Sequence, residues 1–189
     1  MFTAIHEWDV RVIHYIQENL RTPWLDSFMA TFTYFAHAGV FWLALAIILI
    51  IFKKYRRGGV ALLLSQIIVI IGNEAILKNI FRRPRPVDLN PYIEMLVTRR
   101  ANMGYSMPSG HASLSFAAAF VITCINWKWG IAAYVFAAII AFSRVYLYMH
   151  FVTDVTVALF TGTFFAFATI KLVDWIYAKR DERRRSSST

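Results

Sequence analysis

Long apolar runs are the feature that most limits what this chain can fold into. Five of them approach or exceed the roughly 20 residues that cross the hydrocarbon core of a bilayer. They cover residues 28–52, 60–77, 111–127, 130–147 and 152–175. Apolar residues make up 58% of the 189 residues, against about 45–50% in a soluble domain. Because a segment in lipid must satisfy its own backbone hydrogen bonds, the sequence predicts an all-α, multi-pass transmembrane helical bundle with five spans.

The N-terminal segment has a different pattern. Residues 1–21 carry apolar side chains at intervals of three and four, from Phe2 to Leu20, with charged side chains between them. This spacing predicts an amphipathic helix that is too polar to cross a bilayer and lies in its interface. It lacks the charged start, compact apolar core and cleavage site of a signal peptide. Pro23 follows and is expected to end the helix.

Residues 1–177 are predicted to form a single membrane domain that contains the interfacial helix and the five spans. The third and fourth spans are separated only by a short segment around Asn126, which favours a helical hairpin. The polar connection 81–107 is predicted to be a surface loop. Residues 178–189 are basic and rich in serine, which predicts a mobile tail.

The distribution of Lys and Arg predicts the orientation of the spans. Eleven lie on the face that carries the C-terminus and nine on the other. Lys78, Arg85 and Arg144 do not count as orientation signals if they are needed for function. The number on the second face is then six. The positive-inside rule then places the C-terminus in the cytoplasm and the loop 81–107 outside the cytoplasmic membrane.

The formal net charge of +9 does not indicate nucleic acid binding. The positive side chains lie at the ends of apolar segments, where they suit phospholipid headgroups. The single cysteine, Cys124, lies in an apolar run and excludes an intrachain disulfide.

Three polar groups lie beside the predicted spans. They are Lys78–Pro86 at the end of the second span, Pro108–His111 at the start of the third, and Ser143–Asp154 between the fourth and fifth. Since consecutive spans run in opposite directions, all three groups are expected to emerge on the same face of the membrane.

The cationic residues in these groups have the chemistry of a phosphate site. Arginine presents a planar fork to phosphate oxygens and lysine a mobile point charge, so Lys78, Arg85 and Arg144 are candidate phosphate ligands. Ser109 and Gly110 precede an apolar helix, whose first backbone N–H groups attract an anion.

The titratable residues supply a nucleophile and an acid. His150 and Asp154 are four residues apart, so the carboxylate can fix the tautomer of the imidazole that attacks. His111 comes from a different span and can donate a proton to the leaving oxygen. Together with the cations, these residues predict a phosphoryl-transfer site.

These residues resemble the three signatures of the type 2 phosphatidic acid phosphatase superfamily. The matching motifs are Lys-x6-Arg-Pro from Lys78, Pro-Ser-Gly-His from Pro108, and Ser-Arg-x5-His-x3-Asp from Ser143. The resemblance implies that His150 is the phosphorylated nucleophile, Asp154 its partner and His111 the leaving-group acid. It implies that the phosphate ligands are Lys78, Arg85, Ser109, Gly110 and Arg144. It also implies catalysis without a metal or another cofactor.

The resemblance implies a lipid phosphate substrate. Undecaprenyl diphosphate is favoured, with phosphatidylglycerol phosphate and phosphatidic acid as alternatives. Relatives that favour undecaprenyl diphosphate often carry Asp where this chain has Gly110, which keeps phosphatidylglycerol phosphate close behind.

Other polar and aromatic residues have simpler interpretations. Glu74, one turn before Lys78, can pair with that lysine. Arg82 and Arg83 are expected to contact headgroups, and Tyr146 and Tyr148 to belong to an aromatic belt. Structural roles are expected for His6, His14 and His37, and hydrogen bonds to neighbouring helices for Ser65, Gln66 and Asn73.

Two functions from other classes remain open. A vanadate-dependent haloperoxidase resembles the same constellation, but those proteins are soluble and the apolar runs argue against that class. A lipid-binding protein or transporter without enzymatic activity would also place cations near the membrane. A metal hydrolase built from His111, His150 and Asp154 lacks the carboxylate cluster or HExxH motif that would support it.

Overall fold

The computed structural model describes residues 2–35, 39–90, 96 and 104–186. Every regular element in these ranges is a helix. They are α1 (Phe2–Asn19), α2 (Pro23–Phe35), α3 (Val40–Ile51), α4 (Arg56–Ile70), the π-helix η2 (Ile71–Leu77), α5 (Lys78–Phe81), α6 (Pro86–Leu89), α7 (Gly110–Ile125), α8 (Trp127–Tyr146) and α9 (Val152–Ser186).

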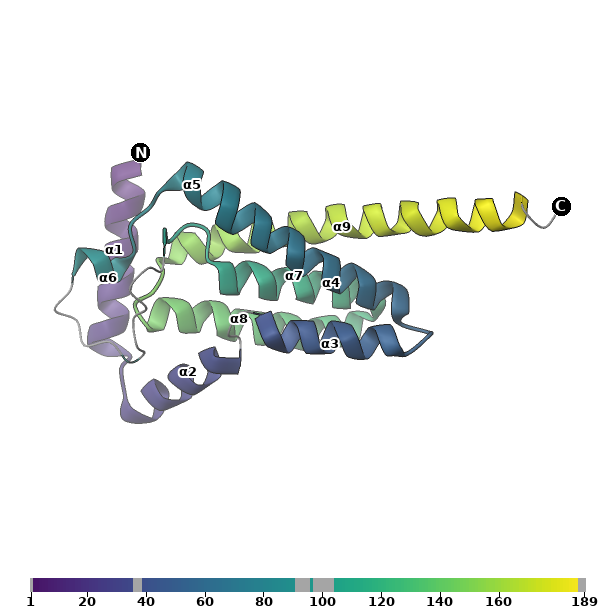
Figure 1. Cartoon of the computed structure of the whole chain (residues 1–189). Coiled ribbons are helices and arrows are strands. Elements are labelled where there is room, and N and C mark those ends of the chain that lie inside the picture. The colour runs from purple at the N-terminus through teal and green to yellow at the C-terminus, as the bar shows by residue number, and fades with distance from the viewer. Residues whose placement is uncertain (1, 36–38, 91–95, 97–103, 187–189) are drawn as a thin grey trace.

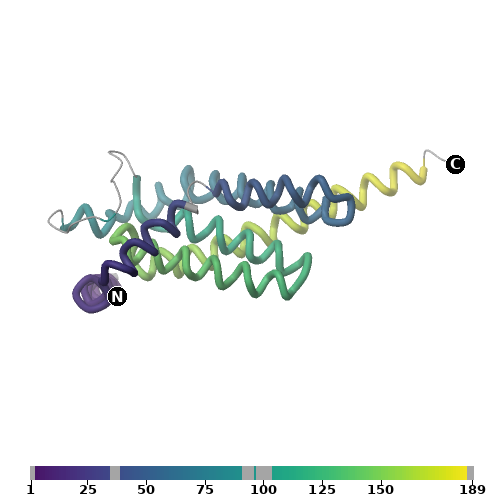
Figure 2. The backbone as a smooth tube through the Cα atoms, turned by 90° about the horizontal axis from the view of Figure 1, so that it is seen from below, coloured from purple at the N-terminus to yellow at the C-terminus, as the bar shows by residue number. Residues whose placement is uncertain are grey.

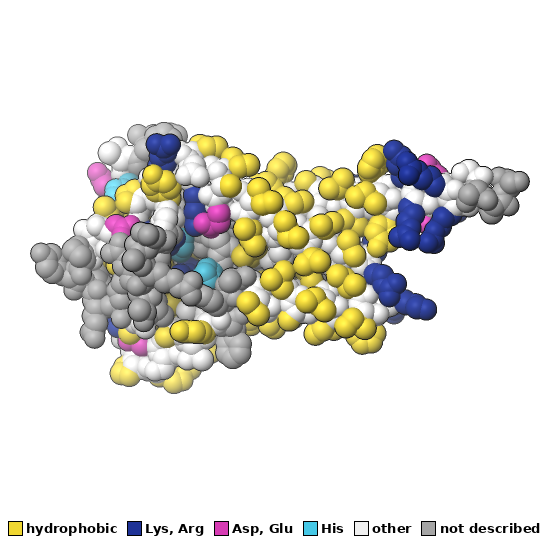
Figure 3. All heavy atoms as spheres, in the orientation of Figure 1, with side chains coloured by type: hydrophobic (Ala, Val, Ile, Leu, Met, Phe, Trp, Pro, Cys, Tyr) yellow, Lys and Arg dark blue, Asp and Glu magenta, His cyan; other side chains and the backbone are white. Residues whose placement is uncertain are grey.

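The predicted all-α transmembrane bundle is confirmed. Three helical segments are long and apolar enough to cross a membrane: Arg56–Leu89, Trp127–Tyr146 and Val152–Ser186. Helices α3 and α7 are apolar but shorter. Exposed apolar side chains cover the middle of the bundle, while Lys and Arg gather at the end that carries the C-terminus (Figure 3). The number of spans stays a prediction.

Helix α7 lies at the centre of the bundle, packed against α4, α8 and α9. Small residues make this possible, since Ala117, Ala118 and Ala119 are fully buried. On α9, a Cβ atom at Gly162 would lie 2.3 Å from the carbonyl oxygen of Ser113, so glycine permits the close approach of the two helices. The first turn of α7, which begins at Gly110, is therefore fixed by its neighbours.

The predicted hairpin between the third and fourth spans is present. Helix α7 ends at Ile125, and α8 begins at Trp127. The side chain of Asn126 accepts hydrogen bonds from the backbone N–H groups of Lys128 and Trp129, which caps α8.

Helix α1 corresponds to the predicted amphipathic segment and runs across one end of the bundle (Figure 1). It is seen end-on in Figure 2. Its apolar side chains Ile13 and Ile16 are buried with Val145 and Tyr146 of α8. The same face of α1 also buries the carboxylate of Asp9 completely. Part of the apolar face of this helix is thus covered by protein, whereas Ile5, Trp8 and Leu20 are exposed.

Two boundaries differ from the prediction. The run 28–52 is divided between α2 and α3, and Gly39, immediately before α3, has a left-handed φ of 72° that interrupts a continuous helix. Helix α9 continues to Ser186, so most of the segment predicted as a mobile tail is helical. The charged residues of that segment favour a helix as readily as a loop, which hydropathy does not reveal.

The three polar residues of the second span behave differently from one another. Gln66 donates from Nε2 to the carbonyl of Leu114 on α7, at 3.3 Å, as predicted. Ser65 instead bonds to Leu62 in its own helix. The buried side-chain amide of Asn73 has no hydrogen-bond partner among the described residues.

Candidate active site

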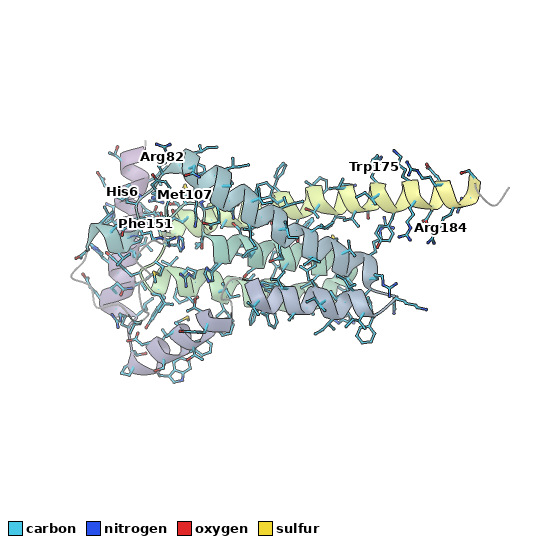
Figure 4. The ribbon with its side chains drawn as sticks, in the orientation of Figure 1. His6, Arg82, Met107, Phe151, Trp175 and Arg184 are labelled. Carbon is cyan, nitrogen blue, oxygen red and sulfur yellow. The ribbon has the colours of Figure 1, made fainter. Side chains whose placement is uncertain are left out.

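The three polar groups meet at the end of the bundle that α1 covers. Lys78 begins α5, Arg85 precedes α6, and Arg144 lies in the last turn of α8. His150 lies in the turn between α8 and α9, and Asp154 in the first turn of α9. Figure 4 labels Phe151, Met107 and His6 at this end, whereas Trp175 and Arg184 mark the opposite part of α9.

The imidazole of His150 lies between a guanidinium and a carboxylate. Nη1 of Arg85 lies 3.0 Å from Nε2 of His150, and Oδ2 of Asp154 lies 3.6 Å from Nδ1. A guanidinium can only donate, so Nε2 is the acceptor and the proton of the neutral ring is assigned to Nδ1. This tautomer presents the lone pair of Nε2 toward Arg85.

Burial keeps this imidazole neutral. The His150 side chain is 2% exposed, and burial, together with the positive charges of Arg85 and Arg144, lowers its pKa to about 3 although Asp154 acts in the opposite direction. At neutral pH the ring is therefore unprotonated at Nε2, as a nucleophile requires.

The lowered pKa makes a prediction for acid stability. Unfolding restores the usual pKa of 6.5 for His150. Between pH 6.5 and about pH 3, His150 therefore binds a proton in the unfolded chain but not in the folded chain. The free energy of unfolding therefore falls as the pH is lowered through this window. We expect the melting temperature in detergent to fall less steeply from pH 6.5 to about 4 in His150→Gln than in the wild type. An equal dependence of the melting temperature on pH in the two proteins would contradict the lowered pKa of His150.

Arg85 is held by the backbone of the loop and the turn. Its guanidinium donates to the carbonyl oxygens of Gly104 at 3.0 Å, Tyr105 at 3.2 Å and Met149 at 3.1 Å. The residue is 5% exposed. Such a network fixes the plane of the guanidinium beside His150.

Arg144 and Lys78 complete a cluster of buried cations. Arg144 donates from Nη1 to the hydroxyl of Thr33 at 2.7 Å, and its Nε has no hydrogen-bond partner in the described part of the chain. Lys78 is 6% exposed. Positive charges at Lys78, Arg85 and Arg144 repel one another electrostatically. A bound anion would relieve this repulsion, so the cluster has the charge and donors for phosphate.

The start of α7 lies beside these cations. Nζ of Lys78 lies 2.6 Å from Oε1 of Glu74, the pairing that its spacing predicted. A Cβ atom at Gly110 would lie 3.0 Å from the same carboxylate oxygen. Gly110 begins α7, and His111 follows it, partly exposed. The hydroxyl of Ser109 is buried, and none of the residues that the structure describes forms a hydrogen bond with it. These observations place the first and second polar groups side by side.

The interpretation of Arg83 as a headgroup contact is wrong. Its side chain is only 14% exposed and forms ion pairs with Asp9 and Asp154 at 2.7 Å each. Asp9 was not identified from the sequence, because the amphipathic pattern of α1 made every charged residue there look exposed. Its position four residues before the buried Ile13 was the available signal. Arg82 is exposed, and the structure leaves its predicted headgroup contact open.

The aromatic belt predicted at the end of α8 is also wrong. Tyr146 and Tyr148 are 0% and 3% exposed. The hydroxyl of Tyr146 donates to Asp26 at 2.5 Å, and that of Tyr148 lies 3.1 Å from Nε2 of His14. These two tyrosines connect α1 and α2 to the bundle. His37 lies outside the described residues.

The chain is similar to several known proteins. The family model of the PAP2 superfamily matches residues 58–178. An undecaprenyl-diphosphatase from Sulfolobus acidocaldarius is 29% identical over 133 residues, which are 69% of this chain and 63% of that protein. The chain therefore spans less than two thirds of the length of this relative.

Two solved structures share the fold. A transmembrane PAP2 type phosphatidylglycerolphosphate phosphatase from Bacillus subtilis superposes with a TM-score of 0.70 at 27% identity, over 93% of this chain and 87% of that one. LpxE from Aquifex aeolicus gives a TM-score of 0.67 at 28% identity, over 85% and 93%. The family model covers more than half of the residues and all three motifs, and the chain belongs to the PAP2 superfamily.

Proposed function

We propose that this protein is an integral membrane phosphatase that removes a phosphate from a lipid phosphate or diphosphate. The observation that carries the proposal is the neutral, buried His150, whose Nε2 faces Arg85 and whose Nδ1 faces Asp154 at the end of a transmembrane bundle. The named activities of the two relatives, an undecaprenyl-diphosphatase and a phosphatidylglycerolphosphate phosphatase, support it.

In the first step, Nε2 of His150 attacks phosphorus in line with the bond to the leaving oxygen. His111 donates a proton to that oxygen as the bond breaks. The ring of His150 gains positive charge as the new bond forms, and the carboxylate of Asp154 stabilises it.

In the second step, water attacks the phosphohistidine and His150 leaves. His111, now unprotonated, removes the proton from the water. Lys78, Arg85 and Arg144, with Ser109 and the backbone N–H of Gly110, hold the equatorial oxygens throughout and stabilise the charge that develops on them. In this proposal no metal or cofactor takes part.

Undecaprenyl diphosphate is the favoured substrate, because the curated relative is named for it. Phosphatidylglycerol phosphate is the alternative, favoured by the similarity to the B. subtilis phosphatase. Either amphiphile suits a site at the end of a bundle, since the tail stays in the bilayer while the headgroup enters between the helices.

We propose that the site faces outward from the cytoplasmic membrane. The described Lys and Arg side chains at the far end of the bundle come from the α3–α4 connection, the start of α8 and the end of α9. By the positive-inside rule that end is cytoplasmic. Labelling of a cysteine introduced at Arg82 by a membrane-impermeant reagent in intact cells, with Cys124 replaced, tests this orientation; protection of that cysteine until the cells are opened would contradict it.

Phosphate release from purified lipid phosphates tests the function. The protein in detergent is given undecaprenyl diphosphate, phosphatidylglycerol phosphate and phosphatidic acid in turn, with EDTA present. We expect turnover of at least one substrate, unchanged by the chelator. Loss of turnover on chelation would contradict the mechanism, and no phosphate release from any of them would contradict the function.

The carboxylate of Glu74 is expected to weaken substrate binding. It is half exposed, pairs with Lys78 and lies beside Gly110, where it competes with the phosphate and repels it. We expect Glu74→Gln to lower KM by about 3- to 10-fold, since each 1.4 kcal/mol of repulsion is tenfold in affinity. The exposed Glu7→Gln on α1 serves as the control. A KM that is unchanged or raised in Glu74→Gln would contradict this role.

A further inference from the structure

A buried network links α1 to Asp154. Nη1 of Arg83 donates to Oδ1 of Asp154 at 2.7 Å, and Nη2 of the same guanidinium donates to Oδ2 of Asp9 at 2.7 Å. Both carboxylates are fully buried. Arg83 therefore bridges a helix that lies outside the three motifs and the carboxylate that faces His150.

The surroundings leave this guanidinium little freedom. Its centre lies 4.2 Å above the ring of Phe151, the residue after His150. Nη1 also donates to the hydroxyl of Thr153 at 2.6 Å. Asp9 in turn accepts hydrogen bonds from the hydroxyl of Thr153 and, at 3.0 Å, from its backbone N–H. Asp9 thus fixes both Arg83 and the first turn of α9.

The network fixes the carboxylate of Asp154 through both oxygens. Oδ1 is held by Arg83, and Oδ2 accepts from the backbone N–H of Phe151 at 2.9 Å while facing Nδ1 of His150 at 3.6 Å. With both oxygens engaged, rotation of Asp154 away from the imidazole would break two charge-assisted hydrogen bonds.

The charges of the network also favour the reaction. Two carboxylates surround one guanidinium, so the group carries a net charge of −1. Without Asp9, Arg83 would cancel the charge of Asp154. With Asp9 present, one negative charge is left over to stabilise the positive ring of His150 when Nε2 bonds to phosphorus.

We propose that Asp9 and Arg83 are positioning residues of this site, acting on His150 through Asp154. This inference rests on the proposed phosphatase function. Because the positive ring exists in the transition state and the phosphohistidine but not in the free protein, loss of the network lowers kcat and leaves KM nearly unchanged.

The test compares variants of the full-length protein on whichever lipid phosphate the wild type hydrolyses fastest. Asp9→Asn is expected to lower kcat about 10-fold and Arg83→Gln about 100-fold, the size of effect that a misplaced catalytic group produces, with KM changed by less than about 3-fold. The double variant should lose no more than Arg83→Gln alone, since Asp9 acts through Arg83. Arg83→Lys keeps the buried charge but cannot bridge both carboxylates, so its kcat should fall between those of the wild type and Arg83→Gln. If Asp9→Asn does not fold, Arg83→Lys tests the network in its place.

Gln17→Ala is the matched control on the same helix. Nε2 of Gln17 donates to the carbonyl of Tyr146 at 2.8 Å, so this change weakens the docking of α1 without touching the network. Its kcat should stay within about 2-fold of the wild type. An equal loss of kcat in Gln17→Ala and Asp9→Asn would show that the loss comes from weaker docking of α1, and it would overturn the proposal.

Two further outcomes are decisive. An active wild type together with unchanged kcat in Asp9→Asn and Arg83→Lys, or a rise in KM alone, would overturn this inference and leave the phosphatase function standing. A wild type that releases no phosphate would overturn the proposed function and the inference with it.

Discussion

Replacing His150 with alanine is expected to lower kcat by at least about 10⁴-fold, the effect of removing a nucleophile whose partners act as one unit. The remaining cations still bind and polarise the phosphate, but no side chain can form the covalent bond. The measurement is phosphate release at saturating substrate. Rapid quenching with labelled substrate should trap an acid-labile phosphoprotein in the wild type and none in the variant.

His14→Gln is a suitable control for this variant. His14 contacts Tyr148 at the same end of the protein, outside the cationic cluster, and its replacement should leave kcat nearly unchanged. Retention of more than about 1% of the activity in His150→Ala would show that another group attacks phosphorus.

Replacing Arg85 with lysine is expected to lower kcat/KM by about 10³-fold, as for the loss of other arginines that stabilise a transferring phosphoryl group. The arginine reaches three backbone carbonyls and Nε2 of His150 at once. A lysine keeps the charge but has no planar fork, so it cannot hold the imidazole and a phosphate oxygen together.

Arg82→Lys is the matched control for Arg85→Lys. Arg82 lies in the same motif, is exposed, and bonds within its own turn to the carbonyl of Asn79 at 2.9 Å. Because Arg85 also fixes the loop, size-exclusion elution and the melting temperature should be measured alongside activity. A folded Arg85→Lys protein with less than a 10-fold loss would contradict the role given to Arg85.

The sequence predicted the meeting of the three motifs because membrane topology leaves little choice. Alternating spans put Lys78, Gly110 and Arg144 at the same end of the bundle, and the structure has them there. Gly162 and the alanines of α7 then allow the helices that carry these residues to pack closely. Hydropathy and motif spacing reveal the common end of the bundle, whereas the close packing of the helices is seen only in the structure.

The residues that the sequence did not reveal depend on contacts between distant segments. Asp9 lies 74 positions before Arg83, and Thr33 lies 111 positions before Arg144. Periodicity reports only which face of one helix is apolar, so it places charged residues of an amphipathic helix in solvent by default. The left-handed Gly39 was hidden for a similar reason, since hydropathy averaged over 28–52 is insensitive to one backbone angle.

The length of α9 has a practical consequence. At 1.5 Å per residue its 35 residues extend for about 52 Å, whereas the hydrocarbon core of a bilayer is about 30 Å thick. Even when tilted, the helix carries its last turns beyond the lipid tails, and the ribbon and the backbone tube both show it extending past its neighbours (Figures 1 and 2). A fluorophore attached near Arg184 would stand on a stiff spacer, and its energy transfer to labelled lipid would report the inclination of the helix in the bilayer.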